Sequence, residues 1–319
     1  MSNKNIYREL CATESTIPVF SRDWWLDAVC DGADNWDVAL VENGGEVMAT
    51  MPYYVKHKYG FTLLTQPPLT QTLGPWIRPS SAKHAKALGQ QKHLMYGLIE
   101  QLPKCDLFMQ NWHYSITNWL PFYWKGFSQT TRYTYVIEDL SDLDKVFSGF
   151  EHSKRKNIKK SEKIINIVFD ITADQFYDNH QMTLLKQNSK ISYSKDLFKR
   201  IYKAGYQNDS ARTIAAYDQY GNLHAALFVI WDNQSAYDLI STIDPDYRNY
   251  GAASLLIREI IKFVSVRTNK FDFEGSMIEQ VERSFRQFGA IQKPYFFISK
   301  TSSRLLRVRD AMKQIVRQA

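Results

Sequence analysis

The chain has 319 residues, of which 44% are hydrophobic and 23% are charged. This length suits two domains of about 150 residues each, and the composition excludes an intrinsically disordered chain. The net charge of +7 favours an anionic partner, such as a phosphate-bearing cofactor, a nucleic acid or an anionic lipid headgroup, without choosing among them.

Several classes of protein are disfavoured by what the sequence lacks. Its longest apolar run, residues 225–231, is far shorter than the ~20 residues that a membrane helix needs. The N-terminus leads into no apolar signal segment, and the three scattered cysteines have no CxxC spacing. The histidines show no metal-ligand spacing. We therefore expect a cytoplasmic protein with reduced thiols, no transmembrane segment and no metal.

The N-terminal half predicts a strand meander followed by a helix. Strands are expected over 37–42 and 47–55, because Asn43, Gly44 and Gly45 form a strong hairpin turn between them. The remaining elements are extended segments over 61–65 and 72–77, a helix over 81–102, and strands over 106–110 and 131–137.

A basic segment separates the two halves. Of the thirteen residues 151–163, six are basic and two are acidic. One interpretation is a solvated helix that links the halves. The other is an anion clamp in which Lys156, Lys159 and Lys160 hold a cofactor phosphate, an RNA acceptor end or a lipid-linked phosphate. The predicted organisation is an N-terminal lobe over 1–150, a basic connecting segment over 151–165 and a C-terminal lobe over 166–319.

The C-terminal half predicts the order β-β-β-loop-α-β-α-β. Its segments are strands over 213–217, 223–231 and 236–243, a loop over 244–251, a helix over 252–267, a strand over 271–274, a helix over 278–288 and a strand over 295–299. The N-terminal half follows a similar order without a residue-level repeat, so an architectural duplication is expected.

The loop that enters the first of these helices carries the clearest chemical signal. It reads Arg248, Asn249, Tyr250, Gly251, Ala252 and Ala253. Free backbone N–H groups and the positive end of the helix dipole meet there, which suits a pyrophosphate. Small residues allow phosphates to approach the backbone, and Arg248 can add a charged contact. The alternative is an ordinary helix start.

This loop resembles the acyl-CoA loop of the GNAT family, Arg/Gln-x-x-Gly-x-Gly/Ala, with Arg248, Gly251 and Ala253 in the named positions. We therefore call residues 248–253 the acyl-donor loop. Residues 271–276 and 281–289 resemble the end of FemAB-type proteins, which are tandem GNAT-like transferases. The resemblance implies an α/β (α+β) fold of two tandem GNAT-like domains, each a mixed, largely antiparallel sheet flanked by helices. It also implies acyl-CoA as the donor, or aminoacyl-tRNA in transfer to a cell-wall precursor. The chain lacks the coiled-coil insertion that such transferases often carry.

The resemblance implies direct attack by an amine on a thioester or ester, and this reaction needs a base and a proton donor. In a strand over 271–274, Asp272 and Glu274 share one face and the two phenylalanines share the other. We expect Glu274 to be the general base. The alternative is that both carboxylates cap loops or pair with arginines such as Arg283 or Arg286.

Other residues could take part. Asp238 and Asp244 are alternative bases, and Tyr247, Tyr250 or Tyr295 could protonate a leaving thiolate, with Tyr295 our preferred candidate. The N-terminal half has no acyl-donor loop between residues 72 and 102, so we expect it to complete the acceptor site.

The sequence thus predicts an acyl-CoA-dependent N-acyltransferase that acts on a small-molecule, sugar-linked or peptide-linked amine. The first alternative is aminoacyl-tRNA-dependent transfer, with tRNA as a partner. The second is a GNAT-like protein that binds a ligand without turnover.

Overall fold

The computed structural model of the chain describes residues 1–275 and 277–309. The chain forms two compact units, an N-terminal unit of Met1–Arg132 with Pro294–Ala319 and a C-terminal unit of Tyr133–Lys293. The boundaries of these units differ from the segments 1–150, 151–165 and 166–319 that the sequence analysis predicts. The reason is that two strands, β6 (Ser128–Ile137) and β12 (Ile291–Thr301), each carry the chain from one unit into the other. Ser276, the last residue of the first FemAB-like stretch, lies outside the described residues.

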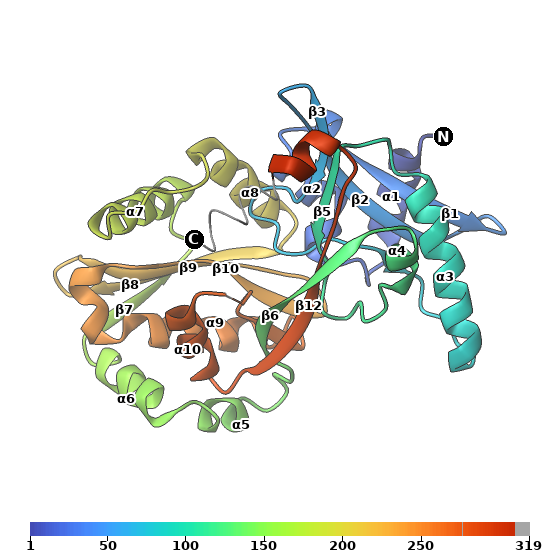
Figure 1. Cartoon of the computed structure of the whole chain (residues 1–319). Coiled ribbons are helices and arrows are strands. Elements are labelled where there is room, and N and C mark those ends of the chain that lie inside the picture. The colour runs from blue at the N-terminus through green and yellow to red at the C-terminus, as the bar shows by residue number, and fades with distance from the viewer. Residues whose placement is uncertain (276, 310–319) are drawn as a thin grey trace. The chain divides into compact units, whose positions relative to one another are not determined.

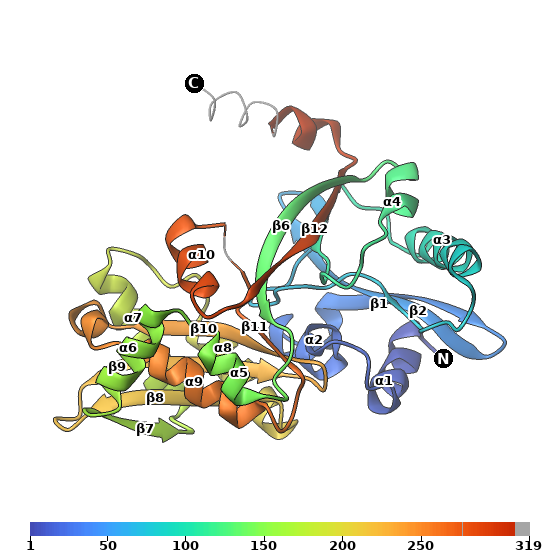
Figure 2. The same ribbon diagram turned by 90° about the horizontal axis from the view of Figure 1, so that it is seen from below.

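The N-terminal unit is a mixed sheet with helices on both faces. Its elements are α1 (Asn3–Thr13), α2 (Asp23–Val29), β1 (Trp36–Asn43), β2 (Glu46–Lys58), β3 (Phe61–Thr65), β4 (Trp76–Ile77), α3 (His84–Glu100), β5 (Leu107–Asn111) and α4 (Leu120–Trp124), with short 3₁₀ turns at Val19–Ser21 and Ala33–Asn35. The strand order is β1-β2-β3-β5-β12, and β4 pairs with β2. Helices α1 and α2 lie on one side of β1 and β2, and α3 and α4 lie on the other (Figure 2).

The C-terminal unit is a second mixed sheet. Its elements after β6 are α5 (Leu143–Ser148), α6 (His152–Ser161), β7 (Ile165–Phe169), α7 (Ala173–Lys186), α8 (Lys195–Gln207), β8 (Ala211–Asp218), β9 (Leu223–Trp231), β10 (Ser235–Ile243), the 3₁₀ helix η3 (Pro245–Tyr250), α9 (Ala252–Val264), β11 (Lys270–Asp272) and α10 (Glu279–Arg286). The strand order is β6-β11-β10-β9-β8-β7, antiparallel throughout except for the parallel pair β10 and β11.

Helices cover both faces of this second sheet, with α7 and α8 on one face and α9, together with α5, α6 and α10, on the other (Figure 1). Strand β9 is therefore buried along almost its whole length, because neither of its faces meets solvent. The helical stripe predicted from the sequence is confirmed, since Leu256, Ile257, Ile260, Ile261 and Val264 are all buried in α9. Among the described residues, no helix has the length and apolar character to span a membrane.

The predicted meander of the C-terminal half is confirmed, and strand 223–231 has the predicted limits. Several predicted elements are shorter in the structure, such as the helices expected over 81–102 and 278–288, which are His84–Glu100 and Glu279–Arg286. The helix expected to reach residue 267 ends at Val264, and only Trp76–Ile77 of the extended segment 72–77 pairs as a strand. The predicted strand over 271–274 ends at Asp272, and this difference affects the site described next.

Candidate functional site

The first three residues of the acyl-donor loop end the 3₁₀ helix η3, and its last two, Ala252 and Ala253, begin α9. Gly251 lies between the two helices with a left-handed φ of 82°, a conformation that glycine adopts without the steric cost of a Cβ. Arg248, Asn249 and Tyr250 are exposed, whereas Gly251 and Ala252 are buried. The glycine therefore turns the chain from an exposed loop into a buried helix start.

Helix α6 packs directly against this loop. A Cβ added to Gly251 would lie 2.7 Å from the Cβ of Asn157 in α6. The Lys160 ammonium donates to the carbonyl of Asn249 at 2.9 Å, and the Ser161 hydroxyl donates to the carbonyl of Tyr250 at 2.6 Å. The space beside Gly251 is thus filled by the basic helix, so the absence of a side chain there serves helix packing.

The three lysines of the predicted anion clamp have different positions. Lys160 holds the acyl-donor loop, and its ammonium also lies 5.3 Å from the ring centroid of Tyr250. Lys156 and Lys159 are exposed on the same helix. Of these three lysines, Lys160 is the one that bonds to the loop within the described part of the chain.

The loop keeps features that suit a phosphate-bearing group. The first N–H groups of a helix have no partner within it, and the helix dipole places partial positive charge at that end. Arg248 adds an exposed guanidinium next to the start of α9. Since α6 occupies the side next to Gly251, a phosphate would bind on the outer side of the loop, near Arg248. These residues fit the phosphate end of an acyl-CoA.

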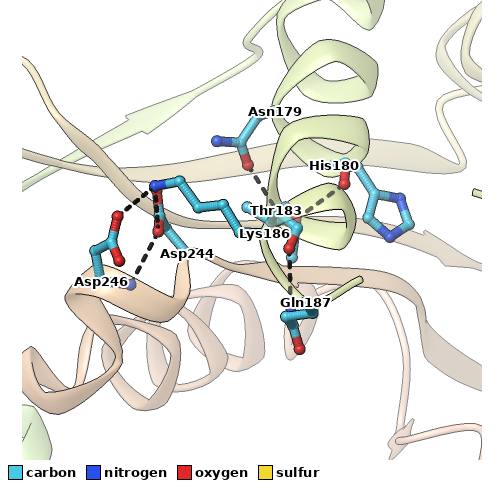
Figure 3. Close-up of polar contacts among 8 residues, drawn as sticks. Asn179, His180, Thr183, Lys186, Gln187, Asp244 and Asp246 are labelled. Atoms are coloured by element: carbon cyan, nitrogen blue, oxygen red, sulfur yellow. Dashed lines mark hydrogen bonds and ion pairs between the residues drawn. The ribbon is translucent and has the colours of Figure 1, made fainter. Parts of the chain in front are cut away.

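Helix α7 anchors the beginning of η3, which leads into the acyl-donor loop, through an ion pair (Figure 3). The Lys186 ammonium lies 2.7 Å from Asp244 Oδ2 and 2.6 Å from Asp246 Oδ2. Asp244 also accepts a hydrogen bond from the backbone N–H of Asp246 at 3.0 Å and so caps η3. The proposed role of Asp244 as a base is therefore not favoured, because its buried carboxylate is held by a cation and a backbone N–H group.

A buried polar network joins α7 to β10 beside this ion pair (Figure 3). The Thr242 hydroxyl donates to Asn179 Oδ1 at 3.1 Å and lies 2.8 Å from the Thr183 hydroxyl. All three side chains are nearly or fully buried. Because buried polar groups are costly unless they are paired, this network fixes how α7 sits against β10.

His224 in β9 packs against η3, which leads into the acyl-donor loop. Its ring stacks on Tyr247 with a centroid distance of 4.1 Å and an interplanar angle of 11°. His224 Nε2 lies 3.2 Å from Asp218 Oδ2. Hydrogen bonding, first of all from the Asn222 side chain, lowers the pKa of Asp218 to about 2. His224 is thus a buried residue of β9, and its ring holds Tyr247 by stacking.

Strands β10 and β11 part beside a group of acidic side chains. Their parallel pairing ends at Tyr237 and Asp272, although β10 continues to Ile243. An irregularity in the pairing of β9 with β10 follows Asp238. Sites in open α/β sheets form where parallel strands end, and bulges are common next to active sites. The point where β10 and β11 separate is therefore the candidate active site.

Three buried carboxyl groups lie at this point, and we call Asp238, Asp272 and Glu274 the carboxyl cluster. Their residues are 4–8% exposed. Asp272 Oδ1 accepts hydrogen bonds from the Thr134 hydroxyl and from the backbone N–H of Glu274, the latter at 2.8 Å. The Ser241 hydroxyl lies 2.8 Å and 2.7 Å from the two carboxylate oxygens of Asp238.

Burial raises the pKa of every member of the carboxyl cluster. It raises the pKa of Asp272 to about 7, although hydrogen bonds from Thr134 and Glu274 oppose the rise. It raises the pKa of Asp238 to about 6, opposed by Ser241. The pKa of Glu274 rises well above its usual range through burial and then through the charges of Asp272 and Asp238. The cluster can therefore hold and release protons near neutral pH.

Glu274 is positioned differently from the prediction. Strand β11 ends at Asp272, and Glu274 has a left-handed φ of 60°. The two carboxyl groups meet through a turn in which Asp272 accepts the Glu274 N–H, so strand alternation does not bring them together. The alternation is confirmed for Phe271 and Phe273, which lie in the hydrophobic core. Asp272 does cap a turn, as the alternative interpretation expected.

The other candidate residues of the sequence have contacts of their own. Arg286 pairs with Glu282 at 3.3 Å. Tyr295 is buried in β12 and belongs to the N-terminal unit. Tyr250 is 40% exposed beside Lys160.

Sequence reasoning missed the residues that hold the site in place. Thr134, Ser241 and Lys186 each contact an acidic residue of the site, yet each comes from a different part of the chain. No local pattern marks them, because a hydroxyl or an ammonium acquires this role only when the fold brings it to a carboxylate.

Comparisons with known proteins agree with this architecture. Residues 149–275 match the family model for the acetyltransferase (GNAT) domain. A search of curated proteins found no significant match. The solved structure of FemX is 9% identical and superposes with a TM-score of 0.65, covering 92% of this chain and 95% of FemX.

A second solved structure, the tandem GNAT protein from the clavulanic acid biosynthesis pathway, is 11% identical with a TM-score of 0.51. That comparison covers 94% of this chain and 95% of the other. The predicted fold class is confirmed. The part of the chain that matches the GNAT domain includes the acyl-donor loop and all three residues of the carboxyl cluster. The overall fold is similar to those of FemX and the tandem GNAT protein.

Proposed function

We propose that the protein is an N-acyltransferase that moves an acyl group from acyl-CoA to a primary amine by direct attack. The observation that carries this proposal is the carboxyl cluster at the separation of β10 and β11, within the region that matches a GNAT domain. A GNAT fold supports acyl transfer in general. The donor, the acceptor and the roles of individual residues are the parts that we propose here.

The acyl-donor loop would bind the phosphate end of the donor. Arg248 and the first N–H groups of α9 would contact the phosphates, and Lys160 would keep the loop in place through its bond to Asn249. Acyl-CoA would supply an activated thioester carbonyl. Since the three described cysteines are free thiols, we place this activity in the reducing cytoplasm.

Asp272 is the best proton acceptor of the carboxyl cluster. An amine is a nucleophile only in its neutral form, so the attacking ammonium must lose a proton. A carboxylate whose pKa is about 7 accepts a proton near neutral pH far better than an ordinary aspartate does. The cluster also attracts a cationic amine, which brings the acceptor and its proton to the same place.

Glu274 suits a different role from the base expected from the sequence. With its pKa well above the usual range, Glu274 holds its proton more tightly than an ordinary glutamate does. A protonated carboxyl donates a hydrogen bond and can return a proton to the leaving group. In the reaction the bond between the acyl carbon and sulfur breaks and a bond between the acyl carbon and nitrogen forms. Asp272 takes the proton that the amine loses, and Glu274 gives a proton to the leaving thiolate.

Aminoacyl-tRNA as the donor is the alternative that one observation favours. Helix α6 lies against the acyl-donor loop with Lys156 and Lys159 exposed, and this concentration of positive charge suits an RNA backbone. In that case the same amine attack would break an ester bond to ribose. Acyl-CoA remains our proposal, because Arg248, Gly251 and Ala253 match the loop pattern of acyl-CoA enzymes.

Calorimetric titration with acetyl-CoA, longer acyl-CoAs and desulfo-CoA, with uncharged tRNA at low salt beside them, tests the donor. We expect CoA binding that weakens about tenfold in Arg248→Ala, as for loss of one charge-assisted contact, while Lys190→Ala, an exposed cation away from the loop, serves as control. Release of free thiol with a panel of amines then tests turnover. We expect it to fall in Asp272→Asn. CoA binding without thiol release from any amine would favour a non-catalytic protein. Binding of tRNA alone would replace our proposal with the alternative.

A further inference from the structure

Helix α4 of the N-terminal unit presents an apolar surface that the proposed reaction does not use. The helix is only five residues long, Leu120–Trp124, but it is firmly anchored. Phe122 is fully buried and packs edge-to-face on Trp112 and Phe127, at centroid distances of 4.7 and 4.9 Å. The outward side chains of α4 are therefore held in place by the core beneath them.

Three of these outward side chains are large, apolar and exposed. Leu120 is 48% exposed, Tyr123 is 58% exposed and Trp124 is 54% exposed. The half-buried ring of Trp119 packs edge-to-face on Tyr123 at 5.5 Å. We call Trp119, Leu120, Tyr123 and Trp124 the aromatic pad. Leucine, tyrosine and tryptophan side by side on a surface are unusual, because exposed apolar groups normally lie scattered.

Lysines border the aromatic pad. The ammonium of Lys92 lies 5.4 Å from the ring centroid of Trp124, and that of Lys125 lies 4.7 Å from the ring of Tyr96. Lys300 lies 4.9 Å from the ring of Phe127. Glu100 is 3.9 Å from Lys125 and offsets one of these charges. The border is therefore positive on balance, as is the whole chain with its net charge of +7.

We propose that the aromatic pad docks the protein on an anionic membrane surface. Tryptophan and tyrosine favour the boundary between lipid headgroups and acyl chains, because their rings are apolar and their N–H and O–H groups stay hydrated. Lysines at the border bind anionic headgroups while their methylene stems lie along the apolar surface. A protein partner fits less well, since lysine is depleted at protein–protein interfaces.

The aromatic pad is too small to insert deeply. A short amphipathic surface with two or three lysines gives reversible binding that depends on anionic lipid and weakens in salt. The inference uses only residues of the N-terminal unit and is independent of the donor and acceptor proposed above.

Co-sedimentation of the full chain with vesicles tests this inference. Vesicles of phosphatidylcholine with phosphatidylglycerol are compared with vesicles of phosphatidylcholine alone. We expect binding to the anionic vesicles that falls about tenfold or more in Tyr123→Ser with Trp124→Ser, since apolar burial supplies part of the affinity. The substitution Lys92→Ala should weaken binding to the anionic vesicles roughly fivefold at low salt.

The matched control is Tyr59→Ser. Tyr59 is 86% exposed, and the ammonium of Lys58 lies 5.2 Å from its ring, but it lies in the hairpin of β2 and β3 and not in the aromatic pad. Its variant should bind vesicles as the unchanged protein does. Melting curves of all variants confirm that they fold.

Quenching by brominated lipids gives a second measurement. Fluorescence of the unchanged protein should fall on anionic brominated vesicles, and Trp124→Phe should lose a large part of that quenching while still binding. Absence of vesicle binding by the unchanged protein would overturn the inference, as would equal binding by the double variant. If the double variant binds vesicles as the unchanged protein does but has a lower sedimentation coefficient without vesicles, the aromatic pad is instead a contact between copies of the chain.

Discussion

A Cβ on Gly251 would lie 2.7 Å from the Cβ of Asn157 and 3.0 Å from its carbonyl oxygen. The start of α9 and the middle of α6 thus meet at a position that only glycine can occupy without a shift of backbone. The same glycine has a positive φ, so two separate physical requirements act on one residue.

These two requirements can be measured separately. Gly221 has a φ of 83°, almost the same as Gly251, but nothing lies within 4 Å of its added Cβ. Gly221→Ala should therefore cost only the strain of a left-handed alanine, about 1 to 2 kcal/mol. Gly251→Ala should cost a further ~1 to 3 kcal/mol for overpacking. Denaturant unfolding of both variants tests this, and equal losses of stability would show that α6 does not press on Gly251.

The buried Asp272 predicts a pH dependence of stability. Its pKa is 3.8 when unfolded and about 7 when folded, so the folded state binds the proton more tightly. Stability from this group is full below pH 4 and is lost as the pH rises to 7, by up to about 4 kcal/mol. Asp272→Asn removes this loss. Its unfolding free energy relative to the unchanged protein should therefore increase between pH 4 and 7, and a constant difference would contradict the assignment.

Thr134 is expected to act as a positioning residue for Asp272. Its hydroxyl donates to Asp272 Oδ1, and this bond lowers the pKa of the carboxyl against the effect of burial. Thr134→Val should raise that pKa further, moving the acidic limb of the pH–rate profile upward by about one pH unit. Thr134→Ser keeps the hydroxyl and should keep the profile. A uniform fall in rate at every pH would indicate only a structural role.

Lys186 predicts a link between α7 and the acyl-donor loop. Its ammonium pairs with the side chain of Asp244, which is 4% exposed, and that of Asp246, which is 67% exposed. Lys186→Met leaves a buried carboxylate without its cation, so the melting temperature should fall by a few degrees and donor binding should weaken. Asp246→Asn should have little effect.

The double variant Lys186→Met with Asp244→Asn provides the control for this ion pair. Replacing the buried carboxylate by an amide removes the unpaired charge, so part of the lost stability should return. If the double variant is as unstable as the sum of the two single variants, the two residues do not act as a pair.

The lysines of α6 should differ in their effect on donor binding. Lys160→Met removes the bond to the Asn249 carbonyl and should weaken the binding of the donor by roughly threefold to tenfold at any salt concentration. Lys156→Met removes an exposed charge, so its effect should disappear as salt screens the interaction. Titrations at low and high salt distinguish them. Equal salt dependence in both variants would instead support the anion clamp, in which these lysines act through their charge alone.

The sequence determined the features that depend on neighbours along the chain. Turn residues and apolar periodicity located the hairpin after β1, the meander of β8 to β10 and the buried stripe of α9, because each depends on a few consecutive residues. The loop pattern of Arg248, Gly251 and Ala253 likewise identified the helix start, and the family resemblance that it supports agrees with the fold.

The tertiary structure decided what each of these residues contacts. Gly251 faces α6, Asp244 is held by Lys186, and Glu274 meets Asp272 through a turn after β11 ends. The raised pKa values of the carboxyl cluster have the same origin. Burial and the distances between charges depend on segments that are far apart in the sequence. A local sequence pattern does not show which of these segments come together in the fold.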